Sequence, residues 1–417
     1  MALKHRLILM NFLQFFIWGA WLITVANYWF GTKQWAGTEF GAIFSTMGIA
    51  SIFMPTLCGI IADRLINAEK LYGILHILGG LTLMYVPQIT NPTSFFWVIL
   101  LAMVFYMPTI ALSNSVAYNS LKKNDLDVVK NFPPIRVWGT IGFIVAMWIT
   151  NLTGNKASEN QFYIAAFAAI TLGIYSFTLP KCEPKHDTKQ NKSFVDLMGL
   201  SSFKLFANYK LALFFIFSMF LGAALQLTNA YGDVYLDDFK HQPEYANSIV
   251  VKYSTIIMSI SQISETLFIL AIPFFLKKFG IKQVMLISMI AWVLRFGLFA
   301  FGNPADGLWM IILSCIVYGM AFDFFNISGS LFVETSTDSS IRSSAQGLFM
   351  MMTNGFGAIL GSISSGYLID HFFTTESGKN WHNIWITFSI YALIIAVLFS
   401  VLFKHKHNPD LIKEVSH

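Results

Sequence analysis

Residues 256–276 read IIMSISQISETLFILAIPFFL, and this stretch is long and apolar enough to cross a lipid bilayer as a helix. Gln262 and Glu265 interrupt the apolar pattern, and they lie one turn apart on a common face of that helix. A carboxylate at the centre of a membrane is costly, so such residues almost always face the protein interior or a water-filled cavity. The stretch therefore predicts a membrane helix with one face turned to a polar site.

The composition extends this prediction to the whole chain. Of the 417 residues, 55% are hydrophobic and only 12% are charged, whereas a soluble domain has roughly 25% charged residues. Too little charge remains to solvate a surface, so we expect most of the surface to face lipid. A net charge of +5 would suggest nucleic acid binding in a soluble protein. Here we expect no nucleic acid partner, because the distribution of the charges matters more than their sum.

Twelve apolar runs are long enough to be membrane helices, each of which needs about 20 residues. They cover residues 7–30, 40–62, 70–89, 94–119, 134–152, 160–179, 211–235, 248–276, 283–302, 307–332, 343–369 and 382–403. Turn-forming sequences separate them, such as TNPTS at 90–94 and NFPPI at 131–135. The runs are far too long for the strands of a membrane barrel. The predicted fold is therefore an all-α membrane protein with twelve transmembrane helices.

The first of these runs follows Lys4, His5 and Arg6, which superficially resembles a signal peptide. The run is longer than the apolar core of a signal peptide, and it has no cleavage site of small residues. We therefore expect a first membrane helix.

The cysteines predict neither a disulfide framework nor a metal site. Only Cys58, Cys182 and Cys315 are present, and they are widely scattered along the chain. Cys58 and Cys315 lie in apolar runs, where we expect them to be small buried side chains.

The positive charges predict how the helices are oriented. With both termini in the cytoplasm, 20 Lys and Arg residues lie on the cytoplasmic side, 5 lie outside and 2 lie within helices, which accounts for all 27. Cytoplasmic loops of membrane proteins are enriched in these residues. The predicted topology has cytoplasmic N- and C-termini.

A hydrophilic segment at 181–209, which begins KCEPKHDTKQNKS, divides the twelve runs into two groups of six. We predict an N-terminal six-helix bundle at 1–180, a cytoplasmic linker at 181–209, and a C-terminal six-helix bundle with a short cytoplasmic tail at 210–417. Short echoes such as IRVWG at 135–139 and IRSSA at 341–345 indicate an internal repeat. Many secondary transporters are built from such repeats, with the substrate site between them near the middle of the membrane.

Two predicted helices have polar residues at helical spacing on one face. Arg136, Thr140 and Phe143 share a face of the helix at 134–152, although Arg136 is close enough to the cytoplasmic end to reach the lipid head groups or a loop acid. In the helix at 211–235, the corresponding set is Gln226, Asn229 and Asp233. Amides this deep face protein or a wet cavity, and hydrogen bonds between helices are the alternative role for them.

The helix at 307–332 has Tyr318, Phe322 and Asn326 on one face, with Asp323 beside them. Counting inward from the loops, Glu265 and Asp323 are the only carboxylates deep in the predicted helices, and no histidine lies as deep. Arg295 is a deep cation, and its role as a structural partner of an acid or as a substrate contact is open at this point.

If these faces converge, they line a cavity with amides, carboxylates, a guanidinium and aromatic rings. Such a cavity suits a neutral, polyhydroxylated ligand with a flat apolar part. No zinc-ligand spacing, phosphate-binding loop or Ser-His-Asp arrangement is present in the sequence. We therefore expect a protein that is not an enzyme and needs no cofactor.

The glycines of TNGFGAILG at 353–361 have the spacing that lets helices approach closely. We expect Gly355, Gly357 and Gly361 to serve helix packing rather than ligand binding.

Several motifs resemble those of known transporters. GIIADRLINAEK at 59–70 is similar to the loop motif of the major facilitator superfamily, with Gly59, Asp63 and Arg64 in place but a later glycine and paired basic residues missing. This departure bears on gating rather than on substrate. Four longer strings resemble the nucleoside:proton symporter family of that superfamily: FLQFFIWGAWL at 12–22, NFPPIRVWGTIGF at 131–143, IIMSISQISETLFILAIPFFL at 256–276 and YGMAFDFFNISGSLFVE at 318–334.

The resemblance implies a permease of the bacterial inner membrane that imports nucleosides such as uridine and adenosine with protons, acting as a monomer. By matching strings, it implies ten substrate-binding positions, all singled out above on physical grounds: Arg136, Thr140, Phe143, Gln226, Asn229, Gln262, Glu265, Tyr318, Phe322 and Asp323. Proton coupling needs a group that is protonated in one state and ionised in another. Asp323 lies among apolar neighbours and is the expected main proton site, with Glu265 as a substrate ligand that has a coupling role.

The alternative is a sugar:proton symporter of the lactose-permease kind, which also has an R-x-x-G-x-x-G-aromatic pattern in its fifth helix and an arginine in its ninth. A nucleoside sensor would need an attached signalling domain for which this chain has no room. A channel would need rings of polar groups along an open path rather than a binding site.

Overall fold

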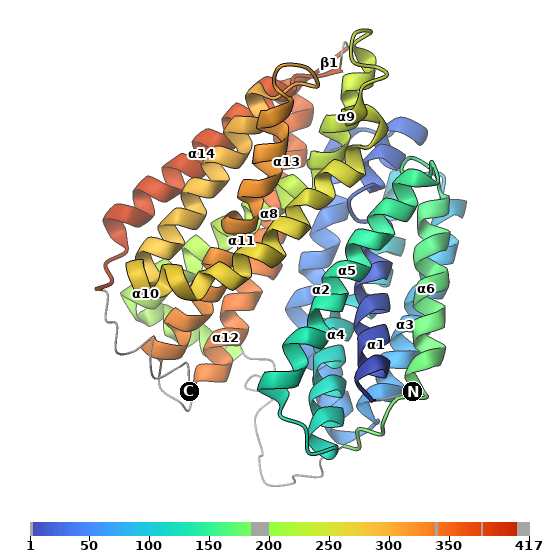
Figure 1. Cartoon of the computed structure of the whole chain (residues 1–417), viewed down its shortest axis with the longest axis vertical. Helices are drawn as coiled ribbons and strands as arrows, with labels where there is room; N and C mark the ends of the chain where they lie inside the picture. Colours follow the sequence, from blue (N-terminus) through green and yellow to red (C-terminus); the bar gives the residue numbers. More distant parts are fainter. Residues whose placement is uncertain (1–2, 185–199, 338–340, 377, 407–417) are drawn as a thin grey trace. The chain divides into compact units, whose positions relative to one another are not determined.

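A computed structural model describes residues 3–184, 200–337, 341–376 and 378–406 of the chain. Residues 185–199 of the predicted linker and residues 407–417 of the predicted tail lie outside the described residues. The chain divides into two compact units, Met1–Met198 and Gly199–His417. Each unit is built from helices that lie alongside one another (Figure 1).

The described residues of unit 1 form six α-helices and two short segments of tighter or wider helix. Its elements are α1 (Leu3–Gly19), the π-helix η1 (Asn27–Thr32), α2 (Gly37–Arg64), α3 (Ala68–Tyr85), the 3₁₀ turn η2 (Val86–Gln88), α4 (Pro92–Lys123), α5 (Val128–Leu152) and α6 (Asn160–Ser176). The predicted break at TNPTS is confirmed. Asn91 precedes α4, and its side chain accepts a hydrogen bond from the backbone N–H of Ser94 at 2.9 Å, while Pro92 occupies the first helical position.

Two helix boundaries in unit 1 differ from the prediction. The run at 7–30 is not one regular helix, because α1 ends at Gly19 and the chain continues through turns into η1. Backbone bonds such as Trp21 N–H to the Trp18 carbonyl tighten the chain there, and the Thr24 hydroxyl donates to Gln161 of α6 at 2.9 Å. The helix predicted to begin at residue 134 begins at Val128, since prolines near a helix start do not interrupt many backbone bonds.

The described residues of unit 2 form seven α-helices, which range from the 4 residues of α9 to the 48 of α10, and one small hairpin. Its elements are η3 (Leu200–Ala207), α8 (Tyr209–Asp238), η4 (Phe239–His241), α9 (Ile249–Lys252), α10 (Ser254–Phe301), α11 (Leu308–Ser336), α12 (Arg342–Met350), the π-helix η5 (Met351–Gly357), α13 (Ala358–Leu368), the π-helix η6 (Ile369–Phe373), β1 (Thr374–Thr375), β2 (Gly378–Lys379) and α14 (Trp381–Leu402). The two strands pair antiparallel, with Thr374 opposite Lys379.

The gap predicted at 277–282 is reduced to a single residue. Gly280 has φ 78° and ψ 169°, a backbone conformation that L side chains rarely adopt, and it separates two helical halves of α10. The halves, residues 254–279 and 281–301, correspond to the helices predicted at 248–276 and 283–302.

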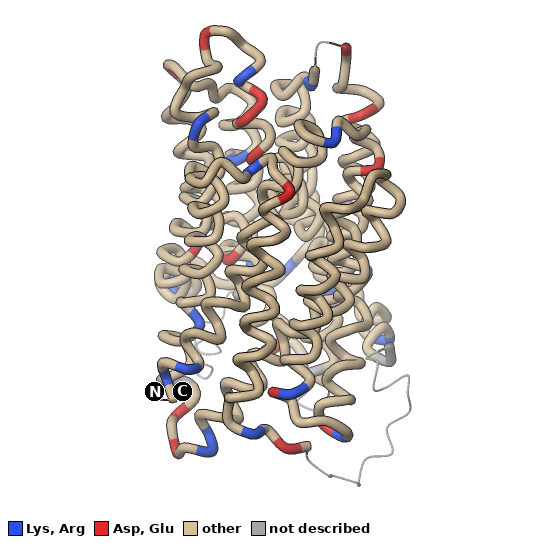
Figure 2. The backbone as a smooth tube through the Cα atoms, turned by 90° about the vertical axis from the view of Figure 1, so that its right-hand side faces the viewer, with Lys and Arg blue, Asp and Glu red and all other residues tan. Residues whose placement is uncertain are grey.

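Within the described residues, eight helices are long and apolar enough to cross a membrane. They are Gly37–Arg64, Pro92–Lys123, Lys130–Leu152, Tyr209–His241, Ser254–Phe301, Leu308–Ser336, Ser344–Phe373 and Trp381–Leu402. Charged residues gather mainly towards the ends of the helices (Figure 2). The all-α membrane class is thus confirmed, while the count of twelve spans stays a prediction.

Glycines set the closest helix contacts of unit 2. A Cβ atom at Gly357 would lie 2.5 Å from the Met219 carbonyl oxygen, and one at Gly361 would lie 2.5 Å from the Cα atom of Ala223. Gly222 faces the Thr353 carbonyl even more closely. These contacts join α8 to η5 and α13, so the predicted packing role is confirmed for Gly357 and Gly361.

All three cysteines are free and buried, as expected for Cys58 and Cys315. Cys182 follows α6, where its backbone N–H donates to the buried Glu69 carboxylate at 2.8 Å. Burial raises the pKa of the Cys182 thiol to about 11, so this thiol stays protonated at neutral pH.

Candidate functional site

The predicted polar face of α5 turns towards α1 within unit 1. The guanidinium carbon of Arg136 lies 4.0 Å from the centroid of the Phe15 ring, which is the distance of a cation–π contact. One turn later, Gly139 leaves the space that this stack occupies: a Cβ atom there would lie 2.7 Å from Arg136 Nη1 and 2.7 Å from Phe15 Cδ2. Thr140 and Phe143 follow on α5, and Arg136, Thr140 and Phe143 are all half-buried.

A second polar group in unit 1 was missed by the sequence prediction. Gln14 of α1 is fully buried, and its Oε1 accepts hydrogen bonds from the Tyr72 hydroxyl at 2.7 Å and from His76 Nε2 at 2.8 Å. Its amide nitrogen donates to the Thr109 hydroxyl at 2.9 Å. The Thr109 hydroxyl donates to the Tyr106 carbonyl, so Thr109 can only accept from Gln14. This fixes the amide orientation and makes His76 a donor through Nε2.

The expectation that no histidine lies deep in the helices is therefore wrong. His76 is only 2% exposed and lies in the middle of α3. The signal was present in the sequence, because GILHILGG at 73–80 places an ionisable residue in an apolar run just as 256–276 does.

In unit 2, the predicted face of α8 is largely buried. Gln226 is 7% exposed and Asp233 is 1% exposed, while Asn229 is half-buried. The side-chain oxygen of Gln226 has no hydrogen-bond partner among the described residues. Asp233 is therefore at least as buried as Glu265 and Asp323, the two carboxylates that were predicted to lie deep.

The first half of α10 meets α11 around Ser264. The Ser264 hydroxyl donates to the Ile316 carbonyl, and a Cβ atom at Gly319 would lie 2.6 Å from the Ser264 carbonyl carbon. Gln262 and Glu265 flank this contact and are half-buried. The Gln262 side-chain oxygen is buried and has no hydrogen-bond partner among the described residues.

Tyr318 lies at the centre of the predicted residues of unit 2. Its side chain is 4% exposed, and Glu265, Arg295 and Asp323 are all close enough to its hydroxyl to act on it electrostatically. Asp323 is 5% exposed. Phe322 and Asn326 are half-buried on the same helix. The structure thus brings Glu265, Tyr318 and Asp323 together.

Arg295, whose role the sequence left open, is fully buried. Its Nε donates to the Thr228 hydroxyl at 3.2 Å, and its Nη1 donates to the Ser314 carbonyl at 2.8 Å and to the Ser261 hydroxyl at 3.4 Å. The guanidinium carbon also lies 4.6 Å from the centroid of the Tyr318 ring.

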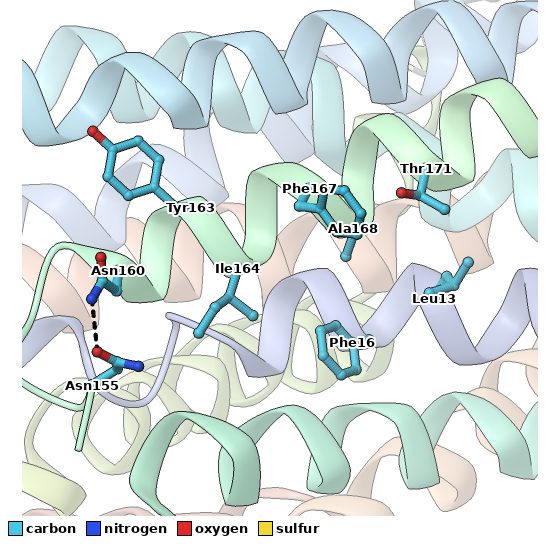
Figure 3. A pocket seen from close by; sticks show the side chains of 9 residues that line it. All are labelled: Leu13, Phe16, Asn155, Asn160, Tyr163, Ile164, Phe167, Ala168 and Thr171. Atoms are coloured by element: carbon cyan, nitrogen blue, oxygen red, sulfur yellow. Dashed lines mark hydrogen bonds between the residues drawn. The ribbon is translucent and has the colours of Figure 1, made fainter. Parts of the chain in front are cut away.

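One cavity lies away from these residues. It has a volume of about 560 Å³ and lies in unit 1 against α1 and α6 (Figure 3), where it is lined by Leu13, Phe16, Asn155, Asn160, Tyr163, Ile164, Phe167, Ala168 and Thr171. A hydrogen bond of 3.0 Å joins Asn160 to Asn155 at one end, and the rest is mostly apolar. This lining suits a lipid chain better than a hydrogen-bonding solute.

A second cavity, of about 540 Å³, touches the predicted face of α11. It is lined by residues of α11 and α12, namely Asn326, Ile327, Ser330, Leu331, Glu334, Gln346, Phe349 and Met350. Gln346 donates to the Ser330 carbonyl at 2.8 Å, so polar groups continue beyond Asn326 along α11. Among the described residues, no group of three His, Cys, Asp or Glu side chains is arranged to hold a metal ion.

Comparisons with known proteins agree along the whole chain. The profile of a family described as nucleoside H⁺ symporters matches residues 1–408. The xanthosine permease of Escherichia coli is 51% identical over 99% of both chains, and the nucleoside permease NupG of the same organism is 49% identical over 100% of both. A crystal structure of NupG with an aspartate-to-alanine substitution superposes with a TM-score of 0.94 at 48% identity, covering 97% of this chain and 100% of the other.

Proposed function

Since this chain belongs to the nucleoside H⁺ symporter family, we propose that it imports nucleosides such as uridine and adenosine together with protons, by alternating access across a bacterial inner membrane. The protein is a transporter and not an enzyme. The family match and the relatives of about 50% identity are nucleoside permeases, so the sugar symporter alternative is not favoured.

One observation supports the nucleoside site most directly. In unit 2, the side-chain oxygens of Gln226 and Gln262 are buried and have no hydrogen-bond partner among the described residues. Gln226 shares a helix face with Asn229, and Gln262 shares one with Glu265. A buried acceptor without a partner is costly unless a ligand supplies a donor. The hydroxyls of a ribose are such donors. We propose that Gln226, Asn229, Gln262 and Glu265 bind the sugar.

Aromatic rings would bind the base. Phe143 in unit 1 and Phe322 and Tyr318 in unit 2 are ring-bearing members of the predicted set, and stacking of a base on an aromatic side chain is worth roughly 1–3 kcal/mol. Arg136, held on Phe15, and Thr140 are the proposed hydrogen-bond donors of unit 1 to the nucleoside. Nucleotides would be excluded, because their phosphates would meet the carboxylates of Glu265 and Asp323.

Asp323 is the proposed main proton site. It is 5% exposed and lies on α11, five residues after the buried Tyr318. Glu265 is the proposed substrate ligand with a coupling role. One proton crossing the membrane releases about 2.3 kcal/mol per 100 mV, which maintains roughly a 50-fold gradient of a neutral substrate.

Together with this function we propose a membrane topology and an oligomeric state. The topology comprises twelve transmembrane helices in two six-helix bundles at 1–180 and 210–417, a cytoplasmic linker at 181–209 and both termini in the cytoplasm, and the oligomeric state is a monomer. The two halves of α10 on either side of Gly280 support counting this 48-residue element as two spans, because one span needs about 20 residues.

Uptake of radiolabelled uridine and adenosine tests the proposal, in cells or vesicles that lack other nucleoside carriers. We expect accumulation against a gradient that unlabelled nucleosides compete and that free ribose and lactose do not. An uncoupler of the proton gradient should abolish the accumulation. Competition by lactose without competition by nucleosides would replace the nucleoside proposal with the sugar alternative.

A further inference from the structure

We propose that Arg295 is a positioning residue. It holds the proposed nucleoside-binding side chains of unit 2 in place and does not itself bind the nucleoside. This inference rests on the proposed function, because it concerns the same site. Arg295 lies in the second half of α10, and its contacts reach three other segments: α8, the first half of α10 and α11.

Three contacts of Arg295 fall on a proposed nucleoside-binding residue or directly beside one, while Ser314 and the Phe299 ring, 4.8 Å from the guanidinium carbon, do not. Thr228, which accepts from Nε, lies between Gln226 and Asn229 on α8. Ser261, which accepts from Nη1, directly precedes Gln262.

On α11 the guanidinium directly contacts Tyr318, a proposed nucleoside-binding residue, since its carbon lies 4.6 Å from the centroid of the Tyr318 ring. Arg295 and Ser314 are joined by two hydrogen bonds: Nη1 donates to the Ser314 carbonyl at 2.8 Å, and the Ser314 hydroxyl donates to the backbone carbonyl of Arg295 at 2.9 Å. Helical backbones are stiff over one turn, so a fixed Thr228, Ser261 and Ser314 fix the residues next to them.

The chemistry of the side chain suits this role. A guanidinium is planar and presents five N–H donors in a rigid fork, so it can hold groups on several sides and stack on a ring at the same time. Lysine has a single ammonium group and cannot reproduce this arrangement. The hydrogen-bond partners of Arg295 are two hydroxyls and a carbonyl, which are positioning partners rather than groups that exchange protons during transport.

The experiment compares Arg295→Lys, Thr228→Val and Ser261→Ala with wild type, by measuring KM and maximal rate of uridine uptake across a range of pH. We expect Arg295→Lys to raise KM about tenfold or more, because the nucleoside-binding residues would shift and no longer meet the nucleoside in the right geometry. Thr228→Val and Ser261→Ala, which each remove one partner, should raise KM by smaller factors. The pH profile of uptake should stay that of wild type in all three variants.

Ser218→Ala is the control. Ser218 is also fully buried, on α8, but its hydroxyl donates to the Phe214 carbonyl of its own helix at 2.7 Å, away from the proposed nucleoside-binding residues. We expect its KM to equal that of wild type.

A double-mutant cycle isolates the contact with Tyr318. Tyr318→Phe keeps the ring and Tyr318→Leu removes it, so in wild type the Leu variant should bind uridine more weakly than the Phe variant. In the Arg295→Lys background the difference between the two variants should be smaller, because the guanidinium that stacks on the ring is gone and only the ring's own contact with the base remains.

The outcomes separate the two proposals. Absence of nucleoside uptake by wild type refutes the proposed function itself. If wild type takes up nucleoside and Arg295→Lys has an unchanged KM, the positioning role is refuted. A pH profile that shifts in Arg295→Lys at unchanged KM would show instead that Arg295 acts on the carboxylates of Glu265 and Asp323. If Arg295→Lys does not reach the membrane, an unchanged KM in both Thr228→Val and Ser261→Ala refutes the role equally.

Discussion

Gly139→Ala tests whether the stacked position of Arg136 on Phe15 is used in transport. The new methyl group would lie 2.7 Å from Arg136 Nη1 and 2.7 Å from Phe15 Cδ2, whereas ordinary contacts begin at 3.4 Å. The guanidinium and the ring must therefore each move by 0.7 Å. The end of an arginine side chain can move that far at little cost, so we expect the protein to fold and to reach the membrane.

The expected loss lies in transport rather than in stability. A misplacement of about 1 Å in a binding or reacting group can cost roughly 100-fold in rate, so we expect uridine uptake to fall by about 10- to 100-fold. Arg136→Lys should cause a similar loss at normal expression, since lysine cannot form the planar stack or the paired hydrogen bonds of the guanidinium.

The assay is initial-rate uptake of radiolabelled uridine, normalised to the amount of protein in the membrane. Gly142→Ala provides the contrast, because its methyl group would overlap the backbone carbonyl of Phe12 and should reduce the amount of folded protein. Wild-type uptake by Gly139→Ala, at wild-type expression, would show that the stacked arginine is not the form that binds substrate.

Three further predictions concern the base, the proton and the packing of unit 2. Phe143→Ala should weaken competition by purine and pyrimidine nucleosides alike, by about 10- to 100-fold; a loss confined to one class would contradict a general stacking role. Asp323→Asn should abolish uphill uptake and its dependence on an uncoupler while nucleoside binding stays measurable by equilibrium dialysis; continued accumulation would transfer the main proton role to Glu265. Gly222→Ala would overlap the Thr353 carbonyl, and overpacking of this kind costs typically about 1–3 kcal/mol, so the apparent melting temperature should fall by about 2–10 °C. Gly347→Ala, with no neighbour within 4 Å, should show no fall, and equal melting temperatures for the two variants would refute the packing argument.

The sequence predicted those features that depend on local chemistry. Long apolar runs define the helices, the Asn91–Pro92 pair defines the start of α4, and the spacing of Gly357 and Gly361 anticipates their contacts with α8. The face of α11 was also predictable, because Tyr318, Phe322 and Asp323 stand out in an apolar run.

Features that depend on pairing between distant segments were not predictable. Nothing near His76 in the sequence indicates that Gln14, 62 residues away, accepts its hydrogen bond. Likewise, Arg295 was identified as a deep cation, but its partners Thr228 and Ser314 are common residues that no pattern distinguishes. The end of α1 at Gly19 was missed because the distortion follows from contacts with α5 and α6, and the local sequence remains apolar.

Only Gly280 separates the two halves of α10, and both halves form hydrogen bonds with α11. Ser264 on one half donates to the Ile316 carbonyl, and Ser288 and Arg295 on the other half donate to the carbonyls of Ala321 and Ser314. Sliding of α11 along its own axis would break its hydrogen bonds with both halves of α10 at once. We therefore expect Tyr318 and Asp323 to move together with α10, so that their exposure changes when the two helices rotate together or when their own side chains change rotamer.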